Sequence, residues 1–205
     1  MFPHKWPISA FVAGNAVLDF LNTVDAQGRS ADQNRLTSYA SVLAWSLAAG
    51  VIDAAQSQSI VVAASSTPAY SERALVGLVQ WRETVYRVFM AICNNKEPPA
   101  NDWKIVETSI KKAISSALLS RDKVGATSWK TPPAITDLTT IPQRLALGLH
   151  ELLASDLVAK IKQCEGCTWL FIDTSKNHRR RWCSMATCGN RAKAQRHYQV
   201  KATAE

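Results

Sequence analysis

The chain has 205 residues, of which 47% are hydrophobic and 20% charged, so it can bury a sizeable core. Its net charge of +8 is unevenly placed, because ten Lys and Arg against three acids lie from Lys160 onward, while the residues before them are nearly neutral. No apolar run reaches the roughly 18–20 residues of a membrane span, and the N-terminus lacks a secretory-signal pattern. We therefore expect a cytoplasmic protein with no membrane partner.

Apolar residues at spacings of three and four predict helices over most of the chain. In chain order we expect helices at residues 17–22, 36–49, 54–67, 71–93, 102–119 and 141–158. Gly50 is expected to end the second helix, Asp53 to cap the third, and Asn101 or Asp102 to cap the fifth. Between the last two helices, residues 121–137 contain a glycine and two adjacent prolines, and a short hairpin would fit there.

Four of the five cysteines lie in the basic tail, as Cys164-Glu-Gly-Cys167 and, fifteen residues later, Cys183-Ser-Met-Ala-Thr-Cys188. A C-x2-C pair presents two sulfurs to one ion, and zinc prefers four tetrahedral ligands. We therefore expect one Zn2+, which is structural because four thiolates leave no position for water or substrate. The alternatives are a redox pair, which needs a βαβ setting, and disulfides, which are rare in the cytosol. The fifth, Cys93, is expected to be a buried inert thiol.

The residues around these cysteines predict how the tail folds. Gly166 lies inside the first knuckle, where we expect a positive φ angle. The β-prone residues 169–173 are expected to pair with a returning strand at residues 181–183. Ser184 or Thr187 would then cap a final helix that carries Cys188 in its first turns.

The predicted fold class is therefore mainly α. A helical N-terminal domain at residues 1–158 is followed by a small zinc module at residues 159–205, a β-hairpin plus a helix in a treble-clef-like arrangement. So small a module buries little apolar surface, and zinc would supply much of its stability. We expect chelation to unfold residues 160–200 while the helical domain survives.

Two stretches resemble known families. Residues 182–193, which contain Cys188-Gly-Asn-Arg191, together with the knuckle and Thr-Trp-Leu-Phe171 after it, closely resemble the CGNR zinc finger. Upstream, Val17-Leu-Asp-Phe-Leu-Asn-Thr23 resembles the signature of the ABATE domain, which precedes this finger in bacterial proteins. Together the two resemblances cover nearly the whole chain. They imply a stress-induced bacterial transcription regulator and identify no ligand.

Basic side chains of the tail are candidates for contacts with nucleic-acid phosphates. The candidates are Arg179, Arg180, Arg181, Arg191, Lys193 and Arg196. The alternative is a structural role, because zinc with four thiolates carries a net charge of −2 that neighbouring cations compensate. For Arg191 both roles are open, since it could donate hydrogen bonds to cysteine sulfurs. For the three adjacent arginines we favour nucleic acid, because compensation does not require three neighbouring guanidinium groups.

The polar residues of the N-terminal signature, Asp19, Asn22 and Thr23, are candidates for a small-molecule pocket in a sensor domain. The alternative is that they cap or connect neighbouring helices while the apolar residues between them form core.

These observations predict a DNA-binding transcription regulator whose helical domain senses a small-molecule effector or forms a homodimer. The alternative is a zinc-stabilised module that binds RNA or an acidic protein. An enzyme is not expected, because the helical domain has no nucleophile motif, phosphate loop or recognisable carboxylate pair. Asp173, Asn177 and His178 suggest a nuclease of treble-clef type, but such a site needs more than one well-placed histidine.

Overall fold

The structure is a computed structural model that describes residues 6–25, 29–30 and 33–202. Its elements in chain order are η1 (Ile8–Ala10), α1 (Ala16–Leu21), α2 (Tyr39–Ala48), α3 (Ala54–Ser66), α4 (Pro68–Cys93), α5 (Ala100–Ser115), β1 (Leu118–Arg121), β2 (Thr127–Lys130), α6 (Thr140–Leu153), η3 (Val158–Lys160), β3 (Ile161–Gln163), β4 (Leu170–Ile172), the π-helical turn η4 (Met185–Gly189) and α7 (Asn190–Ala202). The predicted mainly α class, with a small cysteine-rich hairpin and helix at the end, is confirmed.

Local signals in the sequence explain where α1 and α3 begin and where α2 ends. The Asn15 side chain accepts a hydrogen bond from the Val17 amide at the start of α1. Asp53 caps α3 as predicted and forms a capping box with Gln56. Gly50 follows α2 with a φ angle of +68°, which only glycine adopts at little cost, so the predicted end of that helix is confirmed.

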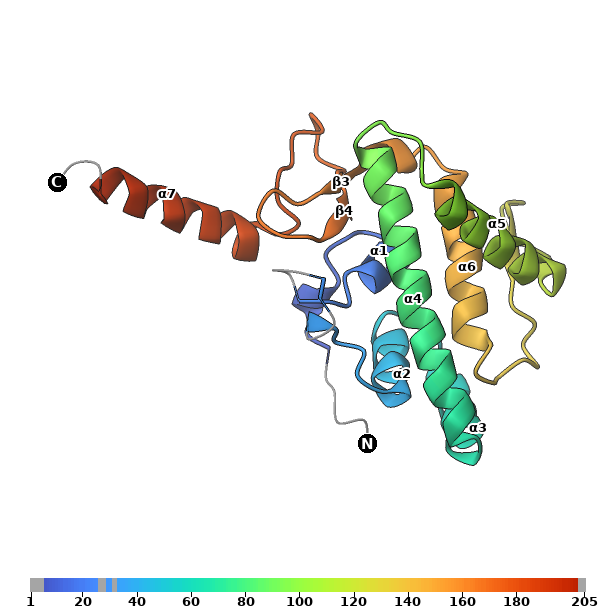
Figure 1. The fold of residues 1–205 in the computed structure, drawn as a ribbon. Helices are drawn as coiled ribbons and strands as arrows, with labels where there is room; N and C mark the ends of the chain where they lie inside the picture. Colours follow the sequence, from blue (N-terminus) through green and yellow to red (C-terminus); the bar gives the residue numbers. More distant parts are fainter. Residues whose placement is uncertain (1–5, 26–28, 31–32, 203–205) are drawn as a thin grey trace.

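The 26-residue helix α4 is the centre of the body (Figure 1). It contacts α1, α2 and α3 as well as α5 and β3. Val85, Val88 and Phe89 of α4 are fully buried in a core that includes Phe20 of α1 and Leu149 of α6. Burial of this one face holds the helices together. Within the described residues, no helix combines the length and the apolar character that crossing a membrane requires.

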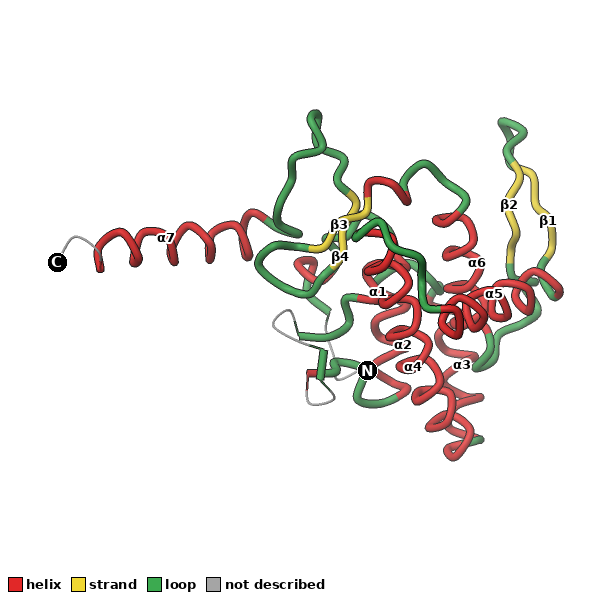
Figure 2. The backbone as a smooth tube through the Cα atoms, turned by 45° about the horizontal axis from the view of Figure 1, so that its top comes forward, coloured by secondary structure: helices red, strands yellow, loops and turns green. Residues whose placement is uncertain are grey.

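Two expected helices end earlier than predicted. Helix α5 stops at Ser115, and Leu118–Arg121 instead pairs antiparallel with Thr127–Lys130, so the β1–β2 hairpin stands out from the helices (Figure 2). Helix α6 ends at Leu153. The predicted cap of α5 is also wrong, because the Asp102 carboxylate lies 2.6 Å from the Arg87 guanidinium on α4 and does not cap its own helix.

The strand pairing in the tail also differs from the prediction. Strand β4 pairs antiparallel with β3, which precedes the first knuckle, with Ile161 opposite Ile172. Residues 181–183 form no strand. The physical reason is burial, because Ile161, Leu170 and Ile172 all belong to the core of the helical body. The hairpin is therefore joined to the body, while α7 extends away from it (Figure 1).

Candidate metal centre

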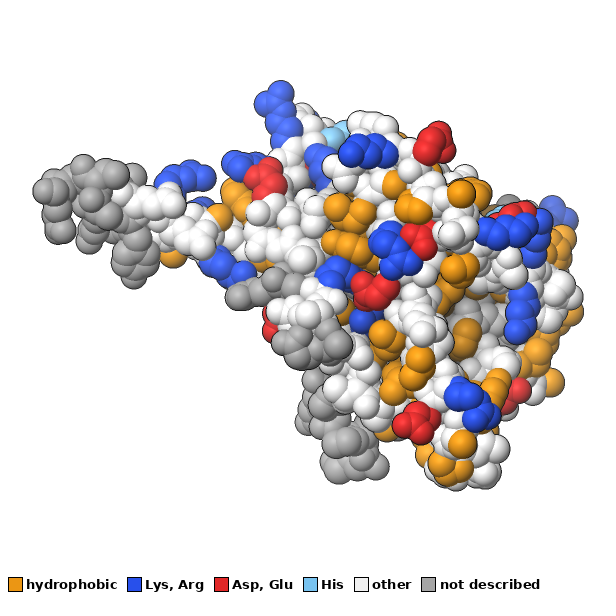
Figure 3. All heavy atoms as spheres, viewed as in Figure 1, with side chains coloured by type: hydrophobic (Ala, Val, Ile, Leu, Met, Phe, Trp, Pro, Cys, Tyr) orange, Lys and Arg blue, Asp and Glu red, His pale blue; other side chains and the backbone are white. Residues whose placement is uncertain are grey.

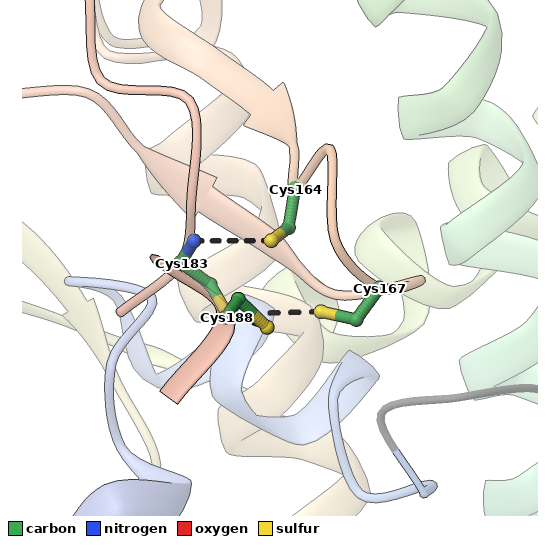
Figure 4. Close-up of side chains that lie close together, drawn as sticks. All are labelled: Cys164, Cys167, Cys183 and Cys188. Atoms are coloured by element: carbon green, nitrogen blue, oxygen red, sulfur yellow. Dashed lines mark hydrogen bonds between the residues drawn. The ribbon is translucent and has the colours of Figure 1, made fainter. Parts of the chain in front are cut away.

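The four tail cysteines converge on one point (Figure 4). Their sulfur atoms all lie within 4.8 Å of one another. The Cys183 sulfur is 3.7 Å from the sulfurs of both Cys167 and Cys188. Tetrahedral zinc with Zn–S bonds of about 2.3 Å requires sulfur–sulfur separations of about 3.8 Å. These separations are close to those of a tetrahedral site, so the cluster fits one zinc ion, and four sulfur ligands make that ion structural.

Backbone amides prepare this cluster for a cation. The amides of Cys183 and Gly166 donate hydrogen bonds to the Cys164 sulfur at 3.2 and 3.4 Å. Hydrogen bonds from the thiols of Cys167 and Cys183, together with these amides, hold the pKa of Cys164 well below its usual range. A thiolate is the form that binds zinc, so these bonds favour the ligand state of Cys164. The same hydrogen bonds to Cys164 raise the pKa values of Cys167 and Cys183.

Two glycines lie in close contact with their neighbours at the metal centre. Gly166 does not have the predicted positive φ angle. A Cβ atom on Gly166 would lie 3.2 Å from the Cβ of Cys188, so a side chain there would require the Cys188 ligand to shift. A Cβ atom on Gly189 would lie only 2.8 Å from the Met185 sulfur. Gly166 therefore lets the two cysteine pairs approach each other, whereas Gly189 only accommodates the flexible, exposed Met185 side chain.

The turn η4 explains most of the Cys188-Gly-Asn-Arg191 sequence. Cys188 is the buried ligand, Gly189 packs on Met185, and the Asn190 side chain donates a hydrogen bond to the Ala186 carbonyl as α7 begins. Arg191 has no such role, because it is exposed and donates to no cysteine sulfur in the described part of the chain. Its contribution must be sought outside the metal centre.

A helical body that carries a tetrathiolate zinc module is the class of protein that this fold and site define. Residues 160–201 match the family model described as "CGNR zinc finger". Residues 14–159 match the ABATE family, described as "Putative stress-induced transcription regulator", and the chain belongs to this family. These are families of regulators and zinc fingers, not of enzymes. No curated protein matches the chain.

The three adjacent arginines have different surroundings. The half-buried Arg180 donates to the Trp182 carbonyl at 2.8 Å and to the Cys183 carbonyl, and its guanidinium lies 4.6 Å from the centre of the Phe171 ring. Arg181 forms an exposed ion pair with Glu165. Arg180 thus stabilises the backbone of the second cysteine pair. This contact favours a structural role for Arg180 over a role in binding nucleic acid.

The other basic candidates are free to meet a partner. Arg179, Arg191, Lys193 and Arg196 are exposed, and none has an acidic partner among the described residues. The structure brings Arg181, Arg191 and Arg196 together around a hollow of about 490 Å³ between the first knuckle and α7. Figure 3 shows Lys and Arg side chains over the described part of this region.

The polar residues of the N-terminal signature make contacts within the protein. The side chain of Asn22 accepts a hydrogen bond from the Leu170 amide and donates one to the Leu170 carbonyl, both at 2.9 Å. The Asp19 carboxylate accepts from the Ala13 amide at 3.0 Å, and burial raises the pKa of Asp19 to about 6. These contacts favour the connecting role over the ligand-pocket role, which stays a prediction.

Two buried residues of α4 with structural hydrogen bonds were missed in the sequence, and of these only Tyr86 binds the zinc module. Arg82 is 2% exposed and donates from Nη1 to the carbonyl and hydroxyl oxygens of Thr23, each at 3.0 Å. The Tyr86 hydroxyl donates to the Thr168 carbonyl beside the first knuckle at 2.9 Å. A buried arginine has no sequence signal, because arginine is most often exposed.

Asp173, the acid of the nuclease hypothesis, is fully buried and already has partners. Its carboxylate accepts hydrogen bonds from the Lys162 ammonium at 2.7 Å, from the Arg180 amide at 2.9 Å and from Ser175. Although burial opposes ionisation, these bonds hold the pKa of Asp173 below its usual range. The carboxylate organises the loop before the second cysteine pair.

Proposed function

We propose that the chain is a zinc-dependent, DNA-binding transcription regulator that acts in the cytoplasm. In this proposal α7 and the exposed basic residues near it bind DNA, and the helical body senses an effector or mediates dimerisation. The observation that carries the proposal is the position of α7, which extends away from the body (Figure 1) and begins two residues after Cys188 of the cysteine cluster.

The dimensions and composition of α7 support a role in a DNA groove. Its 13 residues correspond to a helix about 20 Å long and about 10–12 Å wide. The major groove of B-DNA is about 12 Å wide and admits such a helix. Helices of this length are marginally stable alone in water, and α7 packs chiefly on η4. A polyanionic groove would supply the missing partner.

The charges support a phosphate-binding surface. Exposed cations that neutralise phosphates release counterions, and this release drives binding. Arg191, Lys193 and Arg196 lie on α7, and Arg179 lies on the loop before the second cysteine pair. A single finger covers only about 600–1,000 Å². Useful specificity would therefore favour a homodimer that reads two half-sites.

The test is fluorescence anisotropy with duplexes from the regulator's own genomic region and scrambled duplexes, over a salt series. We expect preference for a genomic fragment and a steep salt dependence. The triple variant Arg191→Gln, Lys193→Gln, Arg196→Gln should reduce the slope of log K against log salt by about 3, if each residue neutralises one phosphate.

A matched control removes the same charge from the β1–β2 hairpin, as Arg121→Gln, Lys123→Gln, Lys130→Gln. This control should retain the salt slope of the unmodified protein. Equal binding to genomic and scrambled duplexes, or equal losses in the two triple variants, would remove the regulator proposal. Tighter binding to single-stranded RNA than to any duplex would instead select the alternative, an RNA-binding module.

A further inference from the structure

We propose that a cavity between α4, α5 and α6 binds a small amphipathic carboxylate, either an aromatic or a medium-chain acid. This inference deepens the proposed sensing role by naming a site and a ligand class. The site lies away from Asp19, Asn22 and Thr23, which the sequence suggested for a pocket.

The cavity has the size and walls of a small-molecule site. Its volume is about 530 Å³, within the range of about 300–1,000 Å³ typical of ligand pockets. Its walls are mostly apolar. They include Ala74, Leu78, Trp81, Ile135, Leu138 and Pro142. In Figure 3 hydrophobic side chains line a hollow beside α4, with Lys and Arg side chains nearby. Such walls favour a ligand whose body is apolar.

The charged groups on the cavity wall are both cations. Arg73 of α4 and Lys112 of α5 belong to the lining, and neither has an acidic partner among the residues that the structure describes. Other cations on the same two helices are paired, since Arg87 binds Asp102 and Lys111 binds Glu107. Two unpaired cations beside an apolar hollow favour an anionic headgroup.

Two of the neutral polar side chains that line the cavity, those of Trp81 and Gln143, already have partners. The Trp81 indole donates to the Ser109 hydroxyl at 3.1 Å, and the Gln143 amide donates to the Ser116 hydroxyl at 2.8 Å. A polyhydroxylated ligand would have to compete with these bonds, whereas a carboxylate needs only the two cations. The chemistry therefore points to an acid with an apolar tail rather than to a sugar.

The cavity is linked to strand β4 through a series of side-chain contacts. Trp81 is in its wall, and the Trp81 ring packs against Phe20 of α1 with centroids 6.1 Å apart. Asn22 lies two residues after Phe20, and its side chain binds Leu170 of β4. A ligand that shifts Trp81 would thus displace α1, and Asn22 at the end of α1 would transmit this shift to β4 of the zinc module.

The test is isothermal titration of the full-length, zinc-loaded protein with octanoate and 4-phenylbutyrate. The neutral and cationic analogues 4-phenylbutanol and 4-phenylbutylamine serve as comparison ligands. We expect at least one acid to bind at least tenfold more tightly than either analogue. The double variant Arg73→Gln, Lys112→Gln should abolish this preference, while Arg121→Gln, Lys123→Gln, which removes equal charge from the hairpin, should retain it.

Gly77→Leu tests the cavity itself. Gly77 lines the cavity, and a Cβ atom there meets nothing within 4 Å, so the helix accepts a side chain at this position. The substitution also replaces a poor helix former by a good one. This variant should fold and lose acid binding. Absence of acid binding at millimolar concentration, equal binding of acid and alcohol, or acid binding unchanged by Gly77→Leu would overturn the inference.

Because these titrations contain no DNA, they are independent of the proposed function. Loss of acid binding with specific DNA binding intact would overturn the cavity assignment alone. Acid binding in a protein that fails to prefer genomic DNA would overturn the regulator proposal alone. A change in DNA affinity on adding the acid is the result expected if both are correct.

Discussion

Single side chains determine how the zinc module is attached to the helical body. Asn22 is 2% exposed, and its amide satisfies both backbone groups of Leu170. Asn22→Ala would leave two buried backbone groups unpaired, at a cost of about 2–4 kcal/mol in the free energy of unfolding. Urea denaturation of the zinc-loaded protein measures this cost.

Asn15→Ala is the matched control for this prediction, because Asn15 only caps α1. It should cost about 1 kcal/mol. If Asn22→Ala were no more destabilising than Asn15→Ala, the connection through Asn22 would have no energetic importance.

Asp19 is a second residue with a measurable signature. Burial raises the pKa of Asp19 to about 6, above its value in the unfolded chain. The folded state therefore holds this proton more tightly, and the resulting stability is complete at acidic pH and lost as the pH rises through 6. Asparagine does not titrate. The stability of Asp19→Asn relative to the unmodified protein should thus increase by about 1 kcal/mol between pH 5 and pH 7.

Chemical denaturation at both pH values measures this difference. The zinc cluster responds to acid in both proteins, so its effect cancels in the comparison. A relative stability that is constant with pH, or that moves in favour of the unmodified protein, would contradict the assignment.

At the scale of elements, the hairpin and α7 depend on zinc to different extents. Strands β3 and β4 place Ile161, Leu170 and Ile172 in the core of the body. Turn η4 carries the buried Cys188 instead, and α7 packs on η4. We therefore narrow the expectation that chelation unfolds residues 160–200. Residues 174–202 should lose amide protection, while β3 and β4 retain much of theirs.

Hydrogen exchange read by mass spectrometry, with and without a zinc chelator, distinguishes these segments. Protection lost equally over residues 160–202 would show that the hairpin is not part of the body. Protection unchanged in α7 would show that zinc does not anchor the helix.

For the whole molecule, the excess of positive charge lies on the part that projects from the helical body. The module from Lys160 onward carries most of the net charge of +8, and α7 extends that charge beyond the body. The division at residue 158 remains a prediction. Because β3 and β4 share the core of the helical body, a boundary there would cut through packed residues.

The metal centre could be predicted from the sequence because its ligands lie in two short clusters, and spacing alone reveals them. Helices α4, α5 and α6 could be predicted because the apolar residues of each recur along one face. The pairing of β3 with β4 could not, since it depends on burial of Ile161 against distant helices. The separate roles of Arg179, Arg180 and Arg181 could not be predicted either. The three residues have the same side chain, and they differ only in the groups that the fold places beside each one.

The most direct test of the central claim is the zinc content of the native protein, measured by elemental analysis together with thiol reactivity. We predict one zinc per chain, with the four tail thiols protected. Cys183→Ser should lose the metal, whereas Cys93→Ser should keep it, since the Cys93 thiol donates to the Ile161 carbonyl outside the cluster. A native protein without stoichiometric zinc, or full metal content in Cys183→Ser, would contradict the account.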